Sequence, residues 1–378
     1  MKVLNSIADL REVARRRVPR AIFQYVDHGS YDEVTLRRNR GDFEALQFRQ
    51  RILVDVARQS MVKTILGREA SMPVVLAPCG LTGLVHRDGE ILAAQAAEAF
   101  GVPLCLSTVS VCSIEDVRAA TTAPFWFQLY VMKDRGYTAA LVDRAEAAGC
   151  PVLVLTVDIP VSGLRRRDAK NGLAVPPRLT LRNLVDMATK PAWVAGVLMG
   201  KRKTFGNLAA AMPHTGVATL SQWIGTQFDA SVTWKDFEQI RARWKGKLVI
   251  KGILDAEDAR QAVALGADAV VVSNHGGRQL DGAPSTIAAL PRVAEAVAGR
   301  SEVLLDSGVR SGQDILKAVA LGANAVLIGR SYLYGLGAAG RPGVTLALEI
   351  LARELQVSLA LTGCNDVRDA SPDILCGP

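Results

Sequence analysis

One histidine in the sequence stands among residues that could carry out acid–base chemistry. His275 lies between Asn274 and the pair Gly276 and Gly277, and Arg278 follows three positions later. An imidazole accepts a proton near neutral pH, and a guanidinium binds a carboxylate through two parallel hydrogen bonds. The spacing therefore predicts a site where a small carboxylic acid is held while a proton is removed.

Two further charged residues extend this chemistry. Asp158 closes an apolar run and could orient the imidazole and stabilise its protonated form, as carboxylates do in catalytic triads. Lys251 ends another run, where an ammonium group could form a Schiff base with a carbonyl substrate. No phosphate-sugar motif supports that aldolase chemistry, and the pair His275 and Arg278 does not require it.

Two glycine–arginine pairs in the C-terminal third indicate an anion site. Gly308 precedes Arg310 by two positions, and Gly329 directly precedes Arg330. Glycine lets backbone N–H groups approach an anion, and arginine binds phosphate in a bidentate manner. We expect these residues to bind a phosphorylated ligand; the alternative is that the glycines only serve tight turns.

Eight short apolar runs must position all of these residues. Near-continuous hydrophobic runs of this length are typical of strands covered on both faces, and alanine-rich segments separate them. Eight such units favour a closed (β/α)₈ TIM barrel, an α/β fold, over an open doubly wound sheet. No GxGxxG motif follows an early strand. The runs are 74–78, 103–108, 125–130, 152–158, 248–252, 269–274, 303–307 and 325–329.

The helices between the runs carry terminal signals. Ser113 with Asp116, and Ser311 with Asp314, are spaced as capping pairs at helix N-termini. Glycines precede the next strand, where a left-handed residue ends a helix. They are Gly101, Gly149, Gly266 and Gly322.

The polar residues above stand at the ends of these strands. In a barrel of this kind the carboxyl ends meet at one mouth, where the active site lies. Each buried charge costs several kcal/mol to desolvate unless it is paired. The convergence of these polar residues at one mouth is therefore the main sequence indication of an active site.

The chain is longer than a plain barrel. Its 378 residues exceed the roughly 250 of a minimal (β/α)₈ barrel. We expect one domain over 1–378, with a helical N-terminal extension at 1–70 that contributes Tyr25 to the mouth. We place a long insertion after the fourth strand, within 159–247, because structureless loops of this length are uncommon unless they are functional.

Composition excludes several classes of protein. Hydrophobic residues make up 49% and charged residues 22%, and the net charge is +8, which fits a globular protein. The basic residues are scattered, so no nucleic-acid partner is expected. The six cysteines lack metal-site spacing, which predicts reduced thiols in the cytoplasm and no metal. We expect His28, His86 and His214 to be structural, and neither a signal peptide nor a membrane span.

The motifs also resemble those of a known family. Ser273–Asp281 reads SNHGGRQLD, with supporting matches at 127–130, 155–158, 251–252 and 305–310. From Tyr25 to the C-terminal helix, the chain is similar to the FMN-dependent 2-hydroxy-acid oxidases and dehydrogenases. These include respiratory L-lactate dehydrogenase, which it resembles most, mandelate dehydrogenase and glycolate oxidase.

The resemblance implies a role for each matching residue. His275 would be the base and Asp158 its partner, Arg165 and Arg278 would bind the substrate carboxylate, and Tyr25 and Tyr130 would hydrogen-bond the substrate. Lys251 would stabilise negative charge on the flavin. The FMN-binding residues would be Pro78, Cys79, Gly80, Ser107, Gln128, Thr156, Lys251, Asp306, Gly308, Arg310, Gly329 and Arg330.

Two positions favour a dehydrogenase over an oxidase. Val109 stands where glycolate oxidase-like members carry tryptophan, and Gly80 where oxidases tend to have alanine. The resemblance thus implies oxidation of L-lactate to pyruvate with a quinone-type acceptor. The alternatives are L-mandelate or another larger 2-hydroxy acid, for which Leu164 and the insertion could shape the pocket, and an oxygen-using oxidase. A flavin-dependent isomerase or a non-catalytic basic scaffold would not need these polar strand ends.

The insertion also suggests a membrane contact. In quinone-linked relatives this region contacts the membrane, and here Lys190 and 201–203 flank apolar residues that could meet an anionic lipid surface. We expect peripheral association through 181–227 at the inner face of the cell membrane; the alternative is a solvated lid. Family resemblance implies a homotetramer. The apolar residues are Trp193, Val194, Val197, Leu198 and Met199.

Overall fold

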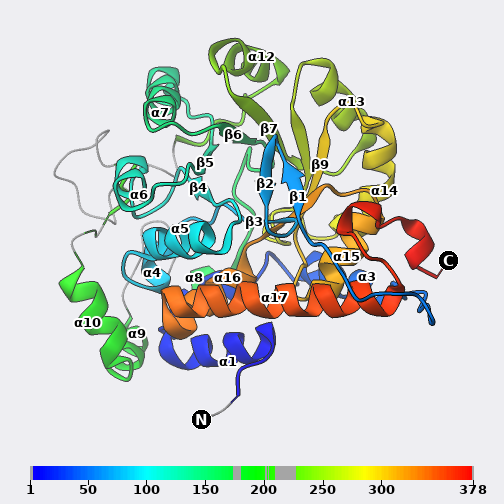
Figure 1. The fold of residues 1–378 in the computed structure, drawn as a ribbon. Helices are drawn as coiled ribbons and strands as arrows, with labels where there is room; N and C mark the ends of the chain where they lie inside the picture. The colour runs from blue at the N-terminus through cyan, green and yellow to red at the C-terminus, as the bar shows by residue number, and fades with distance from the viewer. Residues whose placement is uncertain (1–2, 173–179, 201, 203, 209–226, 377–378) are drawn as a thin grey trace.

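Eight parallel strands form one closed barrel in the computed structural model (Figure 1), which describes residues 3–172, 180–200, 202, 204–208 and 227–376. The strand order is β3-β10-β9-β8-β7-β6-β5-β4, and a parallel bridge between Leu76 and Leu104 closes the ring. The predicted TIM barrel is confirmed. The strands are β3 (Val74–Leu76), β4 (Cys105–Ser107), β5 (Trp126–Leu129), β6 (Val152–Thr156), β7 (Lys247–Ile253), β8 (Ala269–Val272), β9 (Glu302–Asp306) and β10 (Ala325–Ile328).

The strands are apolar on both faces because both faces are buried. In β6, Val152 and Val154 belong to the cluster inside the barrel, whereas Leu153 and Leu155 pack in the larger core beneath the helices. Successive side chains of a strand point to opposite faces. The continuous runs in the sequence follow from this double burial.

The helices surround the barrel (Figure 1). The predicted pairs Ser113 with Asp116, and Ser311 with Asp314, both form reciprocal capping boxes. Gly101 and the three equivalent glycines all have positive φ. The helices are α5 (Gly89–Phe100), α6 (Ile114–Ala120), α7 (Arg135–Ala147), α12 (Trp234–Arg243), α13 (Ala256–Ala264), α14 (Thr286–Val297), α15 (Gly312–Ala320), α16 (Arg330–Ala339) and α17 (Arg341–Thr362).

The N-terminal extension contains helices and also a hairpin that the sequence analysis missed. Helices α1 (Ile7–Arg17), α2 (Arg20–Asp27) and α3 (Val34–Ala45) precede the antiparallel strands β1 (Lys63–Ile65) and β2 (Arg68–Ala70). The hairpin side chains join the interior cluster, and the Leu66 N–H donates to Glu302 at the start of β9. The hairpin therefore closes the amino-terminal end of the barrel and leaves the carboxyl-terminal end for a site.

The segment between β6 and β7 contains both the expected insertion and one helix of the barrel itself. It holds α8 (Arg166–Lys170), α9 (Leu181–Ala188) and α10 (Pro191–Met199), and it then ends in α12, the barrel's own helix. Helices α9 and α10 protrude beside α1 and α4 (Thr82–Val85) at the lower left of Figure 1.

Contacts of the insertion correct the expected orientation of two residues. The Trp193 indole donates to the Leu84 carbonyl, and Arg202 pairs with Asp88 and Asp116. Both side chains therefore face the barrel, because each finds a polar partner there. His214 lies outside the described residues.

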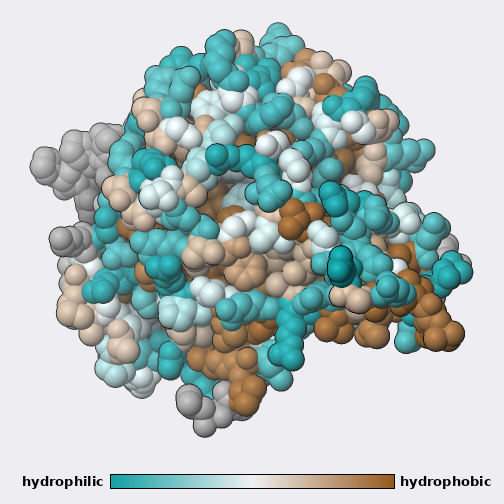
Figure 2. Space-filling model, viewed as in Figure 1, coloured by the Kyte–Doolittle hydropathy of each residue, from teal (hydrophilic) through white to brown (hydrophobic). Residues whose placement is uncertain are grey.

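The surface is mainly hydrophilic on the face shown in Figure 2, with apolar residues gathered along its lower edge. None of the helices in the described part of the chain is long and apolar enough to cross a membrane. All six cysteines are free thiols.

Candidate active site

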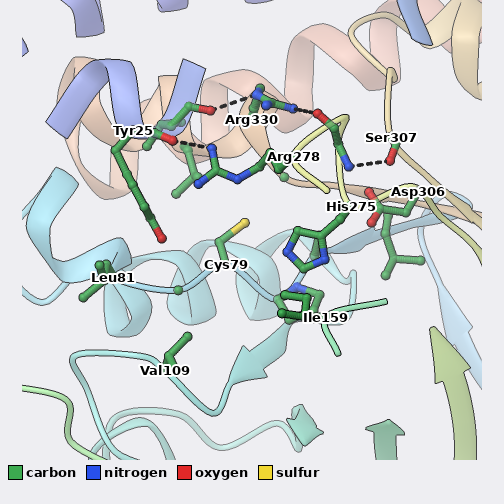
Figure 3. A pocket seen from close by; sticks show the side chains of 18 of the residues that line it. Tyr25, Cys79, Leu81, Val109, Ile159, His275, Arg278, Asp306, Ser307 and Arg330 are labelled. Carbon is green, nitrogen blue, oxygen red and sulfur yellow. Dashed lines mark hydrogen bonds between the residues drawn. The ribbon is translucent and has the colours of Figure 1, made fainter. Parts of the chain in front are cut away.

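A cavity of about 420 Å³ opens at the carboxyl ends of the strands. Figure 3 shows the Tyr25 hydroxyl, Cys79 and the His275 ring facing one space. Most of the residues expected at the site line this cavity, although they come from all parts of the chain. Those lining it are Tyr25, Pro78, Cys79, Gly80, Tyr130, Arg165, Lys251, His275, Arg278, Asp306, Gly308, Arg310, Gly329 and Arg330.

The other expected residues lie behind the cavity lining. Ser107 donates to Gln128 Oε1 over 3.0 Å, and both side chains are buried. Gln128 Nε2 and Thr156 Oγ1 are buried without a hydrogen-bond partner among the described residues. A buried polar atom left unpaired is costly, so these two atoms indicate a polar ligand at this wall.

His275 and Asp158 form the expected pair. His275 Nδ1 lies 2.9 Å from Asp158 Oδ1. The His275 backbone has φ +56, an uncommon left-handed conformation, and its N–H donates to Ser273 Oγ in the turn after β8. Burial lowers the pKa of His275 although Asp158 opposes this. Burial would raise the pKa of Asp158, but the charges of His275 and Lys251 outweigh it and hold that pKa low.

Lys251 is a buried cation between two carboxylates. Its Nζ lies 2.9 Å from Asp306 Oδ2 and 4.0 Å from Asp158 Oδ2, and it donates to Ser273 Oγ. Burial would lower the pKa of Lys251, but the two carboxylates outweigh it and raise that pKa above its ordinary value. This ammonium stays protonated, which argues against a Schiff-base role, since that chemistry needs a neutral amine.

Replacing Lys251 with methionine is expected to lower the free energy of unfolding by about 3–5 kcal/mol, because two buried carboxylates lose their cation. Equilibrium urea unfolding would measure the change. Lys247 is the matched control, since it starts the same strand and pairs with Asp268 while half exposed. Lys247→Met should cost less than about 1 kcal/mol. Equal losses of unfolding free energy in the two variants would show that the buried Lys251 stabilises the fold no more than an exposed ion pair does.

Two arginines and two tyrosines form the polar rim. Arg278 donates to the Tyr25 and His28 carbonyls and lies over the Tyr25 ring, 4.7 Å from its centroid. Burial, with the nearby charge of Arg165, lowers the pKa of Arg278 to about 10. Arg165 Nε is buried without a partner among the described residues. Burial raises the pKa of Tyr130, so its phenol stays neutral. Two crowded cations favour an anionic ligand between them.

The other end of the cavity is suited to a phosphate. Gly308 lines this end with φ +92, and a Cβ there would meet the Asn39 carbonyl, so close packing against α3 by itself requires glycine. Gly329 precedes the N-terminus of α16, where free N–H groups attract anions. Arg310 lies over the Tyr334 ring. Arg330 already donates to three carbonyls, those of Val26, Gly276 and His28, so it also braces the wall.

Several lining residues were missed by the sequence analysis, and one expectation was wrong. Asp168 is buried in the wall near Arg165 and Arg278, and burial raises its pKa. Its position three residues after Arg165 is the signal that could have revealed it. Leu164 is 60% exposed and does not line the cavity, because its side chain points to solvent. The apolar wall instead includes Val109, Ile159, Phe205 and Phe228.

The family comparison agrees with this geometry. The model of the FMN-dependent dehydrogenase family matches residues 14–377. The chain belongs to that family. The curated L-lactate dehydrogenase of Caulobacter sp. (strain K31) is 49% identical over 375 residues, which cover 99% of this chain and 98% of the relative. That of Ectopseudomonas mendocina (strain ymp) is 47% identical, with 99% of both chains covered.

Solved structures of family members share the whole fold. The monotopic membrane protein (S)-mandelate dehydrogenase superposes with a TM-score of 0.95 at 37% identity, with both chains fully covered. A mandelate oxidase superposes with a TM-score of 0.83 at 40% identity, over 99% of this chain and 98% of the other. This chain is therefore an FMN-dependent dehydrogenase with the barrel of these relatives.

The site fits FMN. The unpaired amide of Gln128 and hydroxyl of Thr156 offer hydrogen bonds to the polar edge of the flavin ring. Gly308, Arg310 and the start of α16 offer an anion site at the other end of the same cavity. The orphaned amide and hydroxyl suit the polar ring of this cofactor, and the anion site suits its phosphate.

Proposed function

We propose that this protein oxidises L-lactate to pyruvate and passes the electrons to a quinone-type acceptor. The observation that carries the proposal is the hydrogen-bonded pair of His275 and Asp158 on a cavity that also contains Arg165 and Arg278. A base and two cations beside a flavin site suit a 2-hydroxy carboxylate. The full-length similarity to L-lactate dehydrogenases supports this substrate.

FMN, when bound, would take up the two electrons removed from the substrate. The residues proposed to hold it share the cavity or the wall behind it. Lys251 would place a positive charge beside the flavin ring. Arg310, Gly308 and Gly329 would bind the phosphate. The others are Pro78, Cys79, Gly80, Ser107, Gln128, Thr156, Asp306 and Arg330.

The residues of the chain bind the substrate and move its proton. Arg165 and Arg278 would hold the carboxylate, and Tyr25 and Tyr130 would hydrogen-bond the substrate. The ionised Asp158 accepts from His275 Nδ1–H, which leaves Nε2 as the basic nitrogen. Nε2 would take the hydroxyl proton, and Asp158 would stabilise the resulting imidazolium.

The pH profile should report this histidine. Because the pKa of His275 is held below its ordinary value, kcat/KM for L-lactate should stay constant near neutral pH and fall below an apparent pKa under about 6.5. Anaerobic stopped-flow reduction across pH would measure it. An acid limb whose midpoint lies above about pH 7 would contradict a His275 base with a lowered pKa.

A substrate panel distinguishes the alternatives. L-lactate, D-lactate and L-mandelate would be offered under nitrogen, first with a quinone analogue and then with oxygen as acceptor. The proposal requires the highest kcat/KM for L-lactate with the quinone. A preference for L-mandelate would favour the larger-substrate alternative, and fast turnover with oxygen would favour an oxidase.

Peripheral membrane association is part of the proposal. Exposed apolar side chains gather on α9 and at the end of α10, at Leu181, Leu184, Val185 and Met199. A relative with the same fold is a monotopic membrane protein. We therefore propose contact at the inner face of the cell membrane through the described part of 181–227, and a homotetramer by family resemblance.

A further inference from the structure

We propose that the apolar end of the cavity, lined from α2, α4 and α16 and covered outside by α10, is the docking site for the tail-bearing side of an isoprenoid quinone. The inference rests on the proposed function and adds the place where the second substrate binds. In the overall reaction, the C–H and O–H bonds at the hydroxyl carbon of lactate break, and its C–O bond becomes the C=O bond of pyruvate. The two electrons and two protons end on the quinone, which becomes a quinol.

The cavity lining is of two chemical kinds. Charged residues come from the strand ends, and aliphatic residues come from the surrounding helices; the aliphatic part is called the apolar end. In Figure 3, Leu81 lies beyond Tyr25 and Cys79, on the opposite side of the view from Asp306 and Ser307. FMN and a small hydroxy acid account for the charged residues, so the apolar end is left for a further, apolar ligand.

Three helices build the apolar end. Ile22 comes from α2, Leu84 from α4 and Leu333 from α16, and α4 packs against both of the other helices. Leu81 precedes α4 with φ +58, a conformation that non-glycine residues rarely adopt, and its N–H donates to the Val109 carbonyl. Backbone strain of this kind persists where the surroundings enforce it, often at ligand sites.

The insertion covers the outside of this end. The Trp193 indole of α10 donates to the carbonyl of the cavity-lining Leu84 over 2.8 Å. Asp186 at α9 accepts from the Arg20 N–H at the start of α2, and Lys190 donates to the Arg16 carbonyl. The helix pair is thus fixed directly onto α2 and α4, two of the three helices that form the apolar end, and onto α1.

The outer side of the same helix pair is suited to lipid. Leu181 is 78% exposed and Met199 is 68% exposed, and the sequence of α10, PAWVAGVLM, contains no charge. Within the described residues, α10 therefore connects the exposed Met199 at its end to the cavity-lining Leu84, which its Trp193 contacts. A ligand that is itself dissolved in lipid and carries a reducible ring matches this continuity; a water-soluble acceptor would not need it.

The experiment compares one quinone ring with and without a ten-carbon tail. The measured quantity is the tail preference, kcat/KM for the tailed quinone divided by kcat/KM for the tailless one. Leu84→Glu should lower the tail preference by about tenfold or more, because a charge in an apolar site repels the tail. Trp193→Ala should lower it in the same direction. Leu361→Glu, an exposed leucine on α17, is the matched control and should leave it unchanged.

Photolabelling provides a readout that does not depend on turnover. A tailed azidoquinone should label peptides that contain Leu81–Val85 or Pro191–Met199, and excess tailed quinone should prevent the labelling. Labelling elsewhere, or an unchanged tail preference in both variants, would overturn the acceptor site. Anaerobic flavin reduction by L-lactate is measured first, because its absence in the wild type would refute the proposed function instead.

Discussion

His275→Gln is expected to slow anaerobic flavin reduction by L-lactate by about 10²–10⁴-fold, the usual contribution of a general base. Glutamine can still donate to Asp158 but cannot accept the substrate proton at neutral pH. The flavin should stay bound, since His275 is not among the residues proposed to hold it. Stopped-flow absorbance measures the rate, and the flavin-to-protein ratio measures occupancy.

The control for this variant is His86→Gln. His86 Nδ1 lies 3.0 Å from the Arg87 carbonyl, and the side chain does not line the cavity. Its replacement should leave the reduction rate within about twofold of the wild type, as surface substitutions usually do little. Reduction of His275→Gln at near wild-type rate would exclude His275 as the base.

Arg165→Met should lower kcat/KM for L-lactate by about 10²–10³-fold. Removing one partner of a buried charge pair costs about 2–5 kcal/mol, and the guanidinium of Arg165 is proposed to pair with the substrate carboxylate. Arg165 is a cleaner test than Arg278, because Arg278 also holds the Tyr25 and His28 carbonyls in place.

The uncharged analogue L-lactamide separates carboxylate binding from general damage. The ratio of kcat/KM for L-lactate to that for L-lactamide should collapse in Arg165→Met. Arg166→Met is the matched control, because Arg166 is exposed and pairs with Asp32, so its ratio should not move. A ratio that is equal in the two variants would remove Arg165 from the carboxylate site.

The strands and their polar ends were predictable from the sequence. Because both faces of a barrel strand are buried, β6 reads as an unbroken apolar run and its end is marked by Asp158. The same logic located Lys251, His275 and the glycines near the C-terminus. The cavity then brings these strand ends together as expected.

Other features depend on contacts that the sequence does not display. The β1–β2 hairpin is only three residues per strand and owes its place to packing under the barrel. Trp193 was expected at a lipid surface, but its indole N–H donates to the Leu84 carbonyl, a contact that depends on the fold. Arg330 lines the cavity as expected, but the sequence did not show that it also donates to three carbonyls from distant segments. Each depends on tertiary neighbours rather than local pattern.

The most direct test of the central claim is an anaerobic titration of the purified protein with L-lactate, followed by the visible absorbance of the flavin. The protein should be yellow, and L-lactate but not D-lactate should bleach it, with one equivalent of pyruvate formed per flavin. Protein that stays colourless after incubation with FMN, or yellow protein that L-lactate leaves unbleached, would contradict an FMN site in which His275 takes the hydroxyl proton of lactate.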